Sequence, residues 1–282
     1  MENIPIEDNF EDIVGKAQIG YRISLSELAE KSGVTTKAIQ ALKSGSFDET
    51  ALAAIAPHLN LDAASLLRIA HKSWYPETID CEHVKLFNMP FPMSGYDDMS
   101  VNAYVVSDPT TKDAIVFDSG TDATAMLAYI ERKDLNVRAI FLTHTHRDHI
   151  HDLKRLQGLK SNPPVYVNKH EPLADAQLFN DGEHFGFGSI QCSAKQTSGH
   201  TKGGTTFVIP QNQHFQTPIA IVGDAIFAGS VGGAPSRMRE AVNNIREKIL
   251  TLAPDTLLCP GHGPMTTVDE ERKNNPFFAT SI

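Results

Sequence analysis

The sequence predicts an α+β protein, with a small all-α region followed by a larger region in which strands and helices alternate. Three observations in the 282 residues support this prediction. Residues 20–71 contain helix-capping signals and no alternating apolar pattern, whereas from about residue 83 short apolar runs are separated by turn residues. Between them, "HKSWYPETIDCE" has one proline and no clear periodicity. We therefore predict a helical domain at 1–75, a linker at 76–82 and a second domain at 83–282.

The helical region contains four polar residues at positions typical of helix starts. Ser24 stands three residues before Glu27, which is the spacing of a capping box. Thr35 is expected to cap "TKAIQALKSG", while Asp48 and Asp62 precede "ETALAAIAPHL" and "AASLLRIAH". We therefore expect a short helix after each of the four.

The second region alternates between short apolar runs and amphipathic segments. Helices are expected at "DATAMLAYIERKD" and "SRMREAVNNIREKILTL", the second being long. Strands are expected at "HVKLF", "VNAYVV", "DAIVFDSG", "VRAIFL", "PVYVN", "SIQCSAK", "TTFVIP", "IAIVGD" and "TLLCPG".

Composition indicates a soluble globular protein, since 41% of residues are hydrophobic and 21% are charged. No stretch approaches the roughly 20 apolar residues that span a bilayer, so we expect no membrane partner. The acidic N-terminus lacks the apolar core of a secretory signal. Cys81, Cys192 and Cys259 are too scattered for a disulfide scaffold, so we expect a reducing, cytoplasmic location. The net charge of −9 provides no long-range attraction for nucleic acid.

The densest chemical feature is "THTHRDHIHD" at 143–152, directly after the apolar run "RAIFL". Four other potential ligands stand at strand ends or in glycine-rich turns: Asp118, His200, Asp224 and His262. A neutral imidazole offers one nitrogen lone pair, and a carboxylate can bridge two cations. Neighbouring glycines let the backbone turn sharply enough to bring such side chains together.

Seven of these side chains divide into two groups of metal ligands. Residues two apart in an extended segment point the same way, and the next two ligands follow one short turn later. Such a set can hold two ions roughly 3.5–4 Å apart and leave a coordination position for water. We expect two groups that share Asp224, with His144, His146 and His200 in the first and Asp148, His149 and His262 in the second.

A single His-x-His pair is weak evidence for a metal, but the complete ordered set is difficult to explain by packing. Asp118 is expected to orient a ligand histidine without binding the metal itself. His151 is expected to face solvent on a helix. The remaining histidines have no such context and are predicted to be structural or exposed: His58, His71, His83, His170, His184 and His214.

From about residue 83 onward, these motifs resemble those of the metallo-β-lactamase fold superfamily. The resemblance implies an αββα sandwich of two mixed sheets, with helices outside and the site along one sheet edge. The matching motifs are HxHxDH at His144, His146, Asp148 and His149, GHT at His200, the bridging Asp224, and GHG at His262.

Within that superfamily, "TSGHTKGGTTFVI", "GDAIFAGSVGG" and "PGHGPMTTVDEERKNNPFF" resemble glyoxalase II and its small relatives. The bridging Asp224 argues against antibiotic hydrolysis, because true metallo-β-lactamases usually lack it. The resemblance implies a hydrolase that cleaves a small-molecule thioester or ester by attack of a metal-bridging hydroxide, with Asp148 and Asp224 as its catalytic carboxylates. Two divalent ions are expected, zinc first, with iron or manganese as alternatives because every donor is nitrogen or oxygen.

Two departures from glyoxalase II place its substrate in doubt. Gly233, Ala234 and Pro235 stand where a lysine and a tyrosine usually hold glutathione. The C-terminal helical extension that completes the glutathione site is also expected to be absent, since the sequence given continues only to residue 282. An alternative is a persulfide dioxygenase with a single iron in the first group, although the arginine that such enzymes tend to carry after the segment matching "GSVGG" is missing.

The N-terminal region resembles a Cro/C1-type helix-turn-helix domain, whose recognition helix would present Thr36, Lys37, Gln40 and Lys43. Residues 1–75 carry seven Lys and Arg against ten Asp and Glu, whereas a DNA reader normally shows a basic face. We favour a module for homo-oligomer formation or for covering the hydrolase site over a DNA-binding regulator with a metallohydrolase-fold sensor. The matching positions, mainly core and turn residues, are Leu25, Leu28, Ala29, Gly33, Val34, Ile39, Leu42, Gly45, Leu52, Ile55, Ala56, Leu59 and Leu66.

Overall fold

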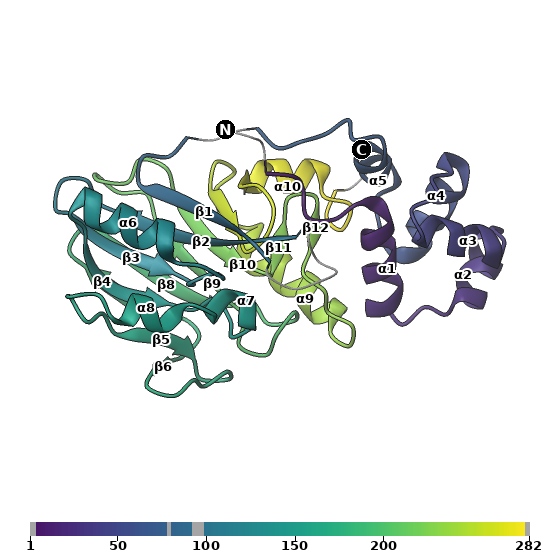
Figure 1. The fold of residues 1–282 in the computed structure, drawn as a ribbon. Coiled ribbons are helices and arrows are strands. Elements are labelled where there is room, and N and C mark those ends of the chain that lie inside the picture. The colour runs from purple at the N-terminus through teal and green to yellow at the C-terminus, as the bar shows by residue number, and fades with distance from the viewer. Residues whose placement is uncertain (1–3, 78–79, 92–98, 280–282) are drawn as a thin grey trace.

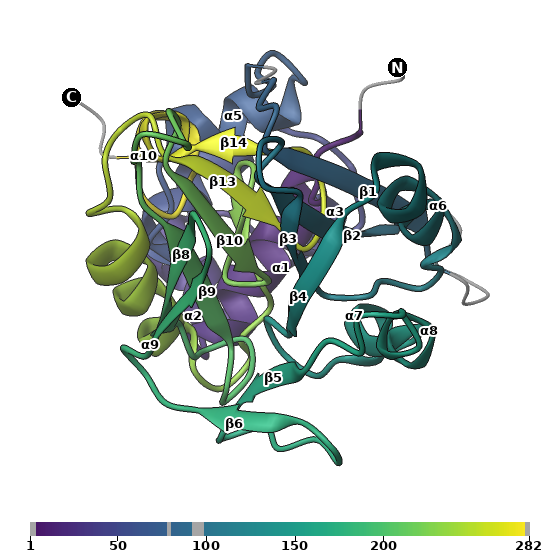
Figure 2. The same ribbon diagram turned by 90° about the vertical axis from the view of Figure 1, so that its left-hand side faces the viewer.

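Two six-stranded sheets stack face to face, and the N-terminal helices form a lobe against one end of the sandwich (Figure 1). The structure is a computed structural model that describes residues 4–77, 80–91 and 99–279. Helices cover the outer faces of the sheets, as the view along the strands in Figure 2 shows. The predicted αββα sandwich, preceded by helices, is therefore confirmed.

The N-terminal lobe contains five α-helices: α1 (Phe10–Gly20), α2 (Leu25–Ser32), α3 (Thr36–Lys43), α4 (Glu49–Ile55) and α5 (Ala63–Ala70), with a 3₁₀ turn at Ala56–Leu59. The four predicted caps are confirmed. Ser24, Thr35, Asp48 and Asp62 each accept a hydrogen bond from the backbone N–H three residues later, at 3.1, 3.2, 2.9 and 2.7 Å. These bonds satisfy N–H groups that have no partner inside the helix.

Helix α1 was not predicted from the sequence, although it carries a recognisable signal. The Asp12 carboxylate accepts a hydrogen bond from the Asn9 N–H at 3.0 Å, which caps the first turn. Phe10, Ile13 and Val14 are buried, and their spacing places them on one face of the helix. The acidic residues between them conceal this apolar stripe in the sequence.

The first sheet has the order β1-β2-β3-β4-β5-β6, and its last four strands run parallel. Helix α6 (Thr124–Lys133) connects two of the parallel strands, and short helices α7 (Arg147–Ile150) and α8 (Leu153–Gln157) follow β4. The strands are β1 (Val84–Pro90), β2 (Ser100–Ser107), β3 (Asp113–Phe117), β4 (Asn136–Phe141), β5 (Val165–Asn168) and β6 (Gln177–Phe179).

The second sheet has the order β14-β13-β10-β9-β8-β7, and β10 pairs with β13 in parallel. Its strands are β7 (His184–Phe187), β8 (Ile190–Gln196), β9 (Thr205–Ile209), β10 (Ile219–Gly223), β13 (Leu257–Pro260) and β14 (Thr266–Thr267). A small hairpin, β11 (Ile226–Phe227) and β12 (Ser230–Val231), follows β10.

The long helix expected at "SRMREAVNNIREKILTL" is present but shorter than predicted, and its geometry changes along its length. Residues 235–237 form a turn, α9 covers Met238–Asn244, and a π-helical turn occupies Ile245–Ile249. The last helix is α10 (Val268–Asn274). Because α9 continues directly into the π turn, the predicted helix is confirmed over 238–249 and is wrong only at its two ends.

The core between the sheets is aromatic, with Phe117, Phe141 and Phe207 all buried and in ring contact. A separate core joins the N-terminal helices to the outer face of the second sheet and to α9, and it includes Ile13 and Met238. At Gly20 a Cβ atom would lie 2.7 Å from the Met238 Cβ, so a glycine is required for this close approach. The N-terminal helices are thus packed against the sandwich. Within the described residues, no helix has the length and apolar character to cross a bilayer.

Candidate metal centre

The fold brings all seven predicted ligands to one edge of the sandwich. His144 and His146 follow β4, and Asp148 and His149 lie in α7. His200, Asp224 and His262 follow β8, β10 and β13, three strands of the second sheet that run in the same direction. Strands that run in the same direction end at the same sheet edge, so residues far apart in the sequence meet there.

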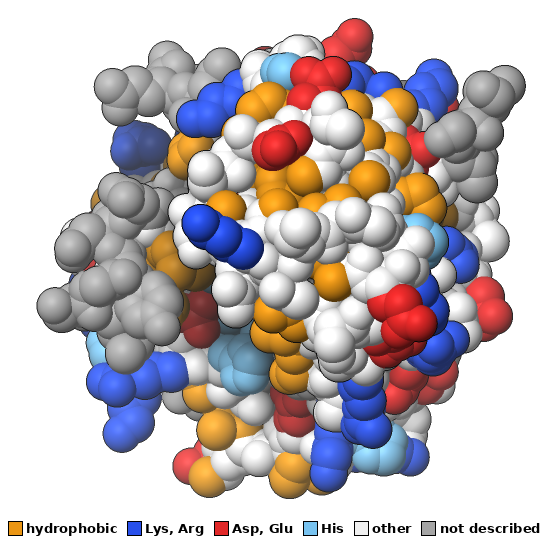
Figure 3. Space-filling model, turned by 90° about the vertical axis from the view of Figure 1, so that its right-hand side faces the viewer, with side chains coloured by type: hydrophobic (Ala, Val, Ile, Leu, Met, Phe, Trp, Pro, Cys, Tyr) orange, Lys and Arg blue, Asp and Glu red, His pale blue; other side chains and the backbone are white. Residues whose placement is uncertain are grey.

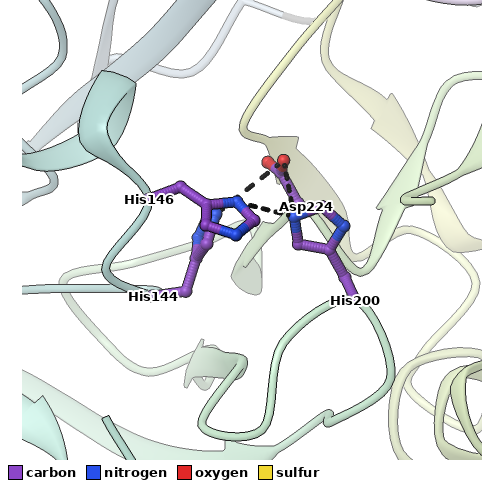
Figure 4. Close-up of side chains that lie close together, drawn as sticks. All are labelled: His144, His146, His200 and Asp224. Carbon is purple, nitrogen blue, oxygen red and sulfur yellow. Dashed lines mark hydrogen bonds and ion pairs between the residues drawn. The ribbon is translucent and has the colours of Figure 1, made fainter. Parts of the chain in front are cut away.

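The first group consists of His144, His146, His200 and Asp224, whose side chains point toward one another in Figure 4. His200 Nε2 lies 3.0 Å from His146 Nδ1. Asp224 Oδ2 lies 3.5 Å from His200 Nε2 and 3.9 Å from His144 Nε2. His146 is exposed and His200 is partly exposed, so this group opens to solvent.

The second group consists of Asp148, His149 and His262. Asp148 Oδ2 lies 3.5 Å from His149 Nε2 and 3.4 Å from His262 Nε2. The Asp224 carboxylate reaches this group as well, with Oδ1 3.3 Å from His149 Nε2 and Oδ2 3.4 Å from His262 Nε2. Asp224 therefore lies between the two groups, in the place that the sequence predicted.

Hydrogen bonds on the far side of three rings fix which nitrogen faces the centre. His149 Nδ1 bonds to Asp118 Oδ2 at 2.9 Å, His200 Nδ1 to the Gly233 carbonyl at 2.9 Å, and His262 Nδ1 to the Ser100 carbonyl at 2.7 Å. These oxygens accept a proton held on Nδ1, which leaves the Nε2 lone pair directed at the centre. That arrangement is typical of metal-ligating histidines.

Asp118 orients His149 without belonging to either group, as the sequence predicted. Its carboxylate also accepts hydrogen bonds from the Thr143 backbone N–H at 2.8 Å and from the Thr143 hydroxyl at 2.7 Å. Its φ of 59° is unusual for a residue other than glycine. Such strain persists where the surroundings over-determine the conformation, and here three hydrogen bonds do so.

Buried atoms without partners show that the donor set fits a cation. Nε2 of His144, Nε2 of His149 and Oδ1 of Asp224 are buried and have no hydrogen-bond partner among the described residues. Leaving a buried polar group unsatisfied costs about 1–3 kcal/mol. All three atoms are lone-pair donors within the two groups, so a divalent metal ion in each group would satisfy them.

The electrostatics of the centre also favour positive charge. Burial would raise the pKa of Asp224, but the charges of His262 and His149 outweigh burial and hold that pKa well below its usual range. Burial would lower the pKa of His149, but Asp224 and Asp118 outweigh it and raise the pKa. For His144, burial lowers the pKa well below its usual range, which keeps that imidazole neutral and able to bind a metal.

Two contributors to the centre were not predicted from the sequence. Glu171 accepts hydrogen bonds from the Thr145 and Gly203 backbone N–H groups, both at 3.0 Å, and so ties the loop of the first two histidines to the loop of His200. Glu7, from the N-terminal segment, lies 4.0 Å from His262 Nδ1. Neither residue stands in a motif, because each reaches the centre from a distant part of the chain.

The histidines outside the groups behave as expected. His151 is exposed in the turn after α7. His83 is buried and its Nδ1 lies 3.2 Å from the Ser107 carbonyl, a structural contact. The others are exposed or partly buried at the surface: His58, His71, His170, His184 and His214.

Comparison with known proteins identifies the family to which these motifs point. A family model described as the metallo-beta-lactamase superfamily matches residues 96–262. The probable metallo-hydrolase YqgX of Bacillus subtilis is 31% identical over 205 residues, covering 64% of this chain and 93% of that protein. The hydroxyacylglutathione hydrolase GloC of Haemophilus influenzae is 30% identical over 191 residues, covering 59% of this chain and 88% of that protein.

Among solved structures, the BLEG-1 B3 metallo-β-lactamase matches with a TM-score of 0.57 and 26% identity, covering 70% of this chain and 100% of that one. The protein TTHA1623 in a di-iron-bound form matches with a TM-score of 0.51 and 25% identity, covering 67% of this chain and 99% of that one.

Proposed function

The chain belongs to the metallo-β-lactamase superfamily, and we propose that it is a metal-dependent hydrolase that cleaves a small-molecule thioester or ester. The observation that carries this proposal is the pair of donor groups joined by Asp224, with buried lone pairs directed at their centres. The superfamily fold implies divalent metal binding. Support for a thioester comes from the similarity to a hydroxyacylglutathione hydrolase.

We assign the first ion to His144, His146 and His200, the second to Asp148, His149 and His262, and Asp224 to both. Bound divalent ions supply Lewis-acid polarisation of a carbonyl and a lower pKa for water, toward neutrality. The donors are nitrogen and oxygen atoms, which suits zinc, and iron or manganese equally. The di-iron form of TTHA1623 supports two ions without deciding the metal of this chain.

The residues around the ligands hold the centre in one arrangement. Asp118 keeps a proton on His149 Nδ1, and the Gly233 carbonyl does so for His200. Asp148, largely buried beside two imidazoles, is placed to take a proton from the reacting water. Hydrolysis adds the water oxygen to the acyl carbon, breaks the carbon–sulfur bond and returns a proton to the thiolate.

The segment after the hairpin supports a substrate other than a glutathione thioester. The Gly233 carbonyl is engaged by His200, and Ala234 is buried in the core that includes the N-terminal helices. Pro235 is exposed but carries no polar side chain. These three positions offer no cation or hydroxyl group to a glutathione peptide. We therefore propose that the enzyme has little preference for thioesters that carry the glutathione peptide over thioesters that lack it.

The proposal is tested by metal analysis and a substrate panel. The purified protein should contain near two metal equivalents, and it should hydrolyse acyl thioesters without the glutathione peptide at least as well as S-lactoylglutathione. His146→Ala should lower the metal content and abolish hydrolysis. Full metal content and activity in that variant would contradict the assignment, and a strong saturable preference for glutathione would contradict the substrate class.

Two further substrates distinguish the alternatives. Oxygen consumption with a persulfide, supported by one iron per chain, would favour the dioxygenase. Efficient opening of a β-lactam ring would favour an activity like that of the BLEG-1 relative. The proposed thioester hydrolase requires neither oxygen consumption with a persulfide nor opening of a β-lactam ring.

For the N-terminal helices we propose a role in covering the hydrolase site, in preference to DNA binding. Charged side chains are sparse near the middle of the face in Figure 3, which looks onto this lobe. Phe47, just before α4, is exposed. Lys43 on α3 donates a hydrogen bond to Gln18 at 2.6 Å, which engages one of the few cations available for phosphate contacts. Selection of bound DNA from a random duplex pool tests this assignment. Recovery of a palindromic consensus whose binding is lost in Gln40→Ala would make the lobe a DNA-binding regulator. If the lobe instead serves self-association, the protein would sediment as a dimer.

A further inference from the structure

The N-terminal segment before α1 crosses the turn that carries His262. The Glu7 carboxylate Oε1 lies 4.0 Å from His262 Nδ1. At Gly263, whose φ is +73°, a Cβ atom would lie 3.2 Å from the Glu7 nitrogen and 3.6 Å from the Pro5 carbonyl oxygen. The segment therefore lies directly on the backbone of the glycine-rich turn, and Glu7 reaches a ring of the second group.

Contacts on both sides of Glu7 hold this segment in place. The Tyr75 hydroxyl donates a hydrogen bond to the Ile4 carbonyl at 2.7 Å. Asp8 pairs with Lys16 and accepts a hydrogen bond from Ser230, while Lys16 also donates to the Val231 carbonyl at 3.1 Å. These contacts join α1 to the hairpin that follows Asp224.

Burial raises the pKa of Glu7 to about 7, and His262 is the largest of the nearby charges that oppose this rise. The Glu7 side chain is only 12% exposed, and within the described residues His262 is its one charged partner within 4 Å. A buried carboxylate is costly unless positive charge lies nearby. His262 Nδ1 already donates to the Ser100 carbonyl, so the Glu7 carboxylate adds negative charge beside a ring whose Nε2 faces the centre.

The two groups differ in the oxygen atoms that lie beside the histidine nitrogens facing away from the metal centre. In the second group, the Asp118 carboxylate accepts a hydrogen bond from His149 Nδ1. The Glu7 carboxylate lies 4.0 Å from His262 Nδ1, whose hydrogen bond goes to the Ser100 carbonyl, so Glu7 acts on that ring through its charge. In the first group, His144 contacts the Thr143 hydroxyl and His200 the Gly233 carbonyl, both neutral. A carboxylate behind a ligand histidine raises its basicity, and removing such a partner typically lowers metal affinity about 10- to 100-fold.

We propose that Glu7 is a positioning residue for the second group, through which the N-terminal lobe strengthens the binding of one cation in the hydrolase. This inference rests on the proposed metal centre and extends it to a residue outside the family motifs. The N-terminal lobe thus contributes a charged side chain to the centre. Its packing against the hydrolase domain therefore affects metal binding.

The test uses the full chain with His146→Ala as the background, so that the first group is weakened and zinc binding reports mainly the second. Glu7→Gln in that background should weaken zinc binding about tenfold or more. Glu30→Gln, which removes the same charge from an exposed position on α2, is the matched control and should leave it unchanged. Glu7→Asp should restore part of the affinity, and Co²⁺ absorption should show a changed ligand field in Glu7→Gln alone.

Three outcomes would overturn the inference. Equal zinc affinity in the Glu7→Gln and Glu30→Gln proteins would do so while leaving the proposed hydrolase intact. Equal weakening of both groups in the otherwise wild-type chain, together with a lower melting temperature of the metal-free protein, would reduce Glu7 to a structural residue. Failure of the wild-type chain itself to bind two cations would remove the metal centre and the inference with it.

Discussion

The two donor groups share Asp224 but differ in exposure and in the charge behind them. The first group opens to solvent through His146, whereas His149 and His262 in the second are buried. The histidine nitrogens that face away from the centre contact neutral oxygens at His144 and His200 in the first group. In the second group, His149 bonds to the Asp118 carboxylate, and the Glu7 carboxylate lies 4.0 Å from His262, which bonds to the Ser100 carbonyl. The open group is therefore placed to meet a substrate, whereas the enclosed group is held by contacts with the surrounding fold.

Their attachment to the fold differs in the same way. The open group lies on two loops that Glu171 ties together through backbone hydrogen bonds. The enclosed group is held by Asp118, by the β2 carbonyl of Ser100 and by the N-terminal segment at Glu7. Changes to the enclosed group should therefore affect folding as well as metal binding, and the following predictions test that distinction.

The largest effect is expected at the residue that the groups share. Asp224→Asn keeps the shape but removes the charge that reaches both groups. Metal binding contributes several kcal/mol of transition-state stabilisation, so activity should fall about 10³-fold or more. Elemental analysis should show loss from both groups. Retention of two tightly bound ions would show that the groups do not depend on Asp224.

His149→Ala and His146→Ala should separate the groups by stability. Removing buried His149 leaves the Asp118 carboxylate without its imidazole partner, which should cost about 3 kcal/mol in the metal-free protein. Exposed His146 supports no such network, so its removal should cost about 0.5 kcal/mol or less. Urea unfolding of both metal-free proteins measures the difference. Equal losses would mean that the enclosed group is not part of the framework.

Asp118→Asn should weaken the enclosed group selectively. Asparagine tolerates the left-handed backbone conformation, but it keeps only one acceptor oxygen and loses the negative charge. Its NH₂ group must face either the Thr143 N–H or the His149 Nδ1–H. We expect zinc affinity of the second group to fall about 10-fold or more, with little change in the first. Competitive chelator titration resolves the two affinities. A uniform loss from both groups would contradict the distinction between neutral and charged support.

Glu271 offers a smaller test on the enclosed side, away from the ligands. Its carboxylate accepts hydrogen bonds from Thr266 at 2.8 Å, Asn275 at 2.8 Å and the Gly229 N–H at 3.0 Å, which ties α10 to the hairpin after Asp224. Burial nevertheless raises the pKa of Glu271 from 4.5 to about 7. Between these values the folded protein holds a proton that the unfolded chain has lost, so stability falls as pH rises from 4.5 to 7.

Glu271→Gln should remove this pH dependence. In the wild-type chain the free energy of unfolding should fall between pH 5 and pH 8. In Glu271→Gln this fall should be about 1–2 kcal/mol smaller. Urea titrations of metal-free proteins measure it, with Glu131→Gln on the exposed face of α6 as the control. An unchanged pH slope would show that Glu271 stays ionised when buried.

Much of the fold could be predicted because its signals are local. Side-chain oxygens of Ser24, Thr35, Asp48 and Asp62 cap helices through contacts three residues away. The nine predicted strands followed from short apolar runs, whereas the short strands β6, β7, β11, β12 and β14 were not predicted. Helix α1 was missed because its capping pair and apolar stripe are interspersed with acidic residues, and the change from α to π geometry at Ile245 was not predicted either.

The sequence by itself determined the seven members of the candidate site, since their residue types and spacing form ordered motifs at strand ends. Apart from Asp118, which the sequence also indicated, only the tertiary structure decided which residues support them. Glu171, Glu7 and the Gly233 carbonyl reach the centre through loops and an N-terminal segment whose positions depend on packing between distant elements. Local patterns report hydrogen bonds within a few residues of the chain, whereas the charge and solvent exposure of a site depend on every element that the fold places around it.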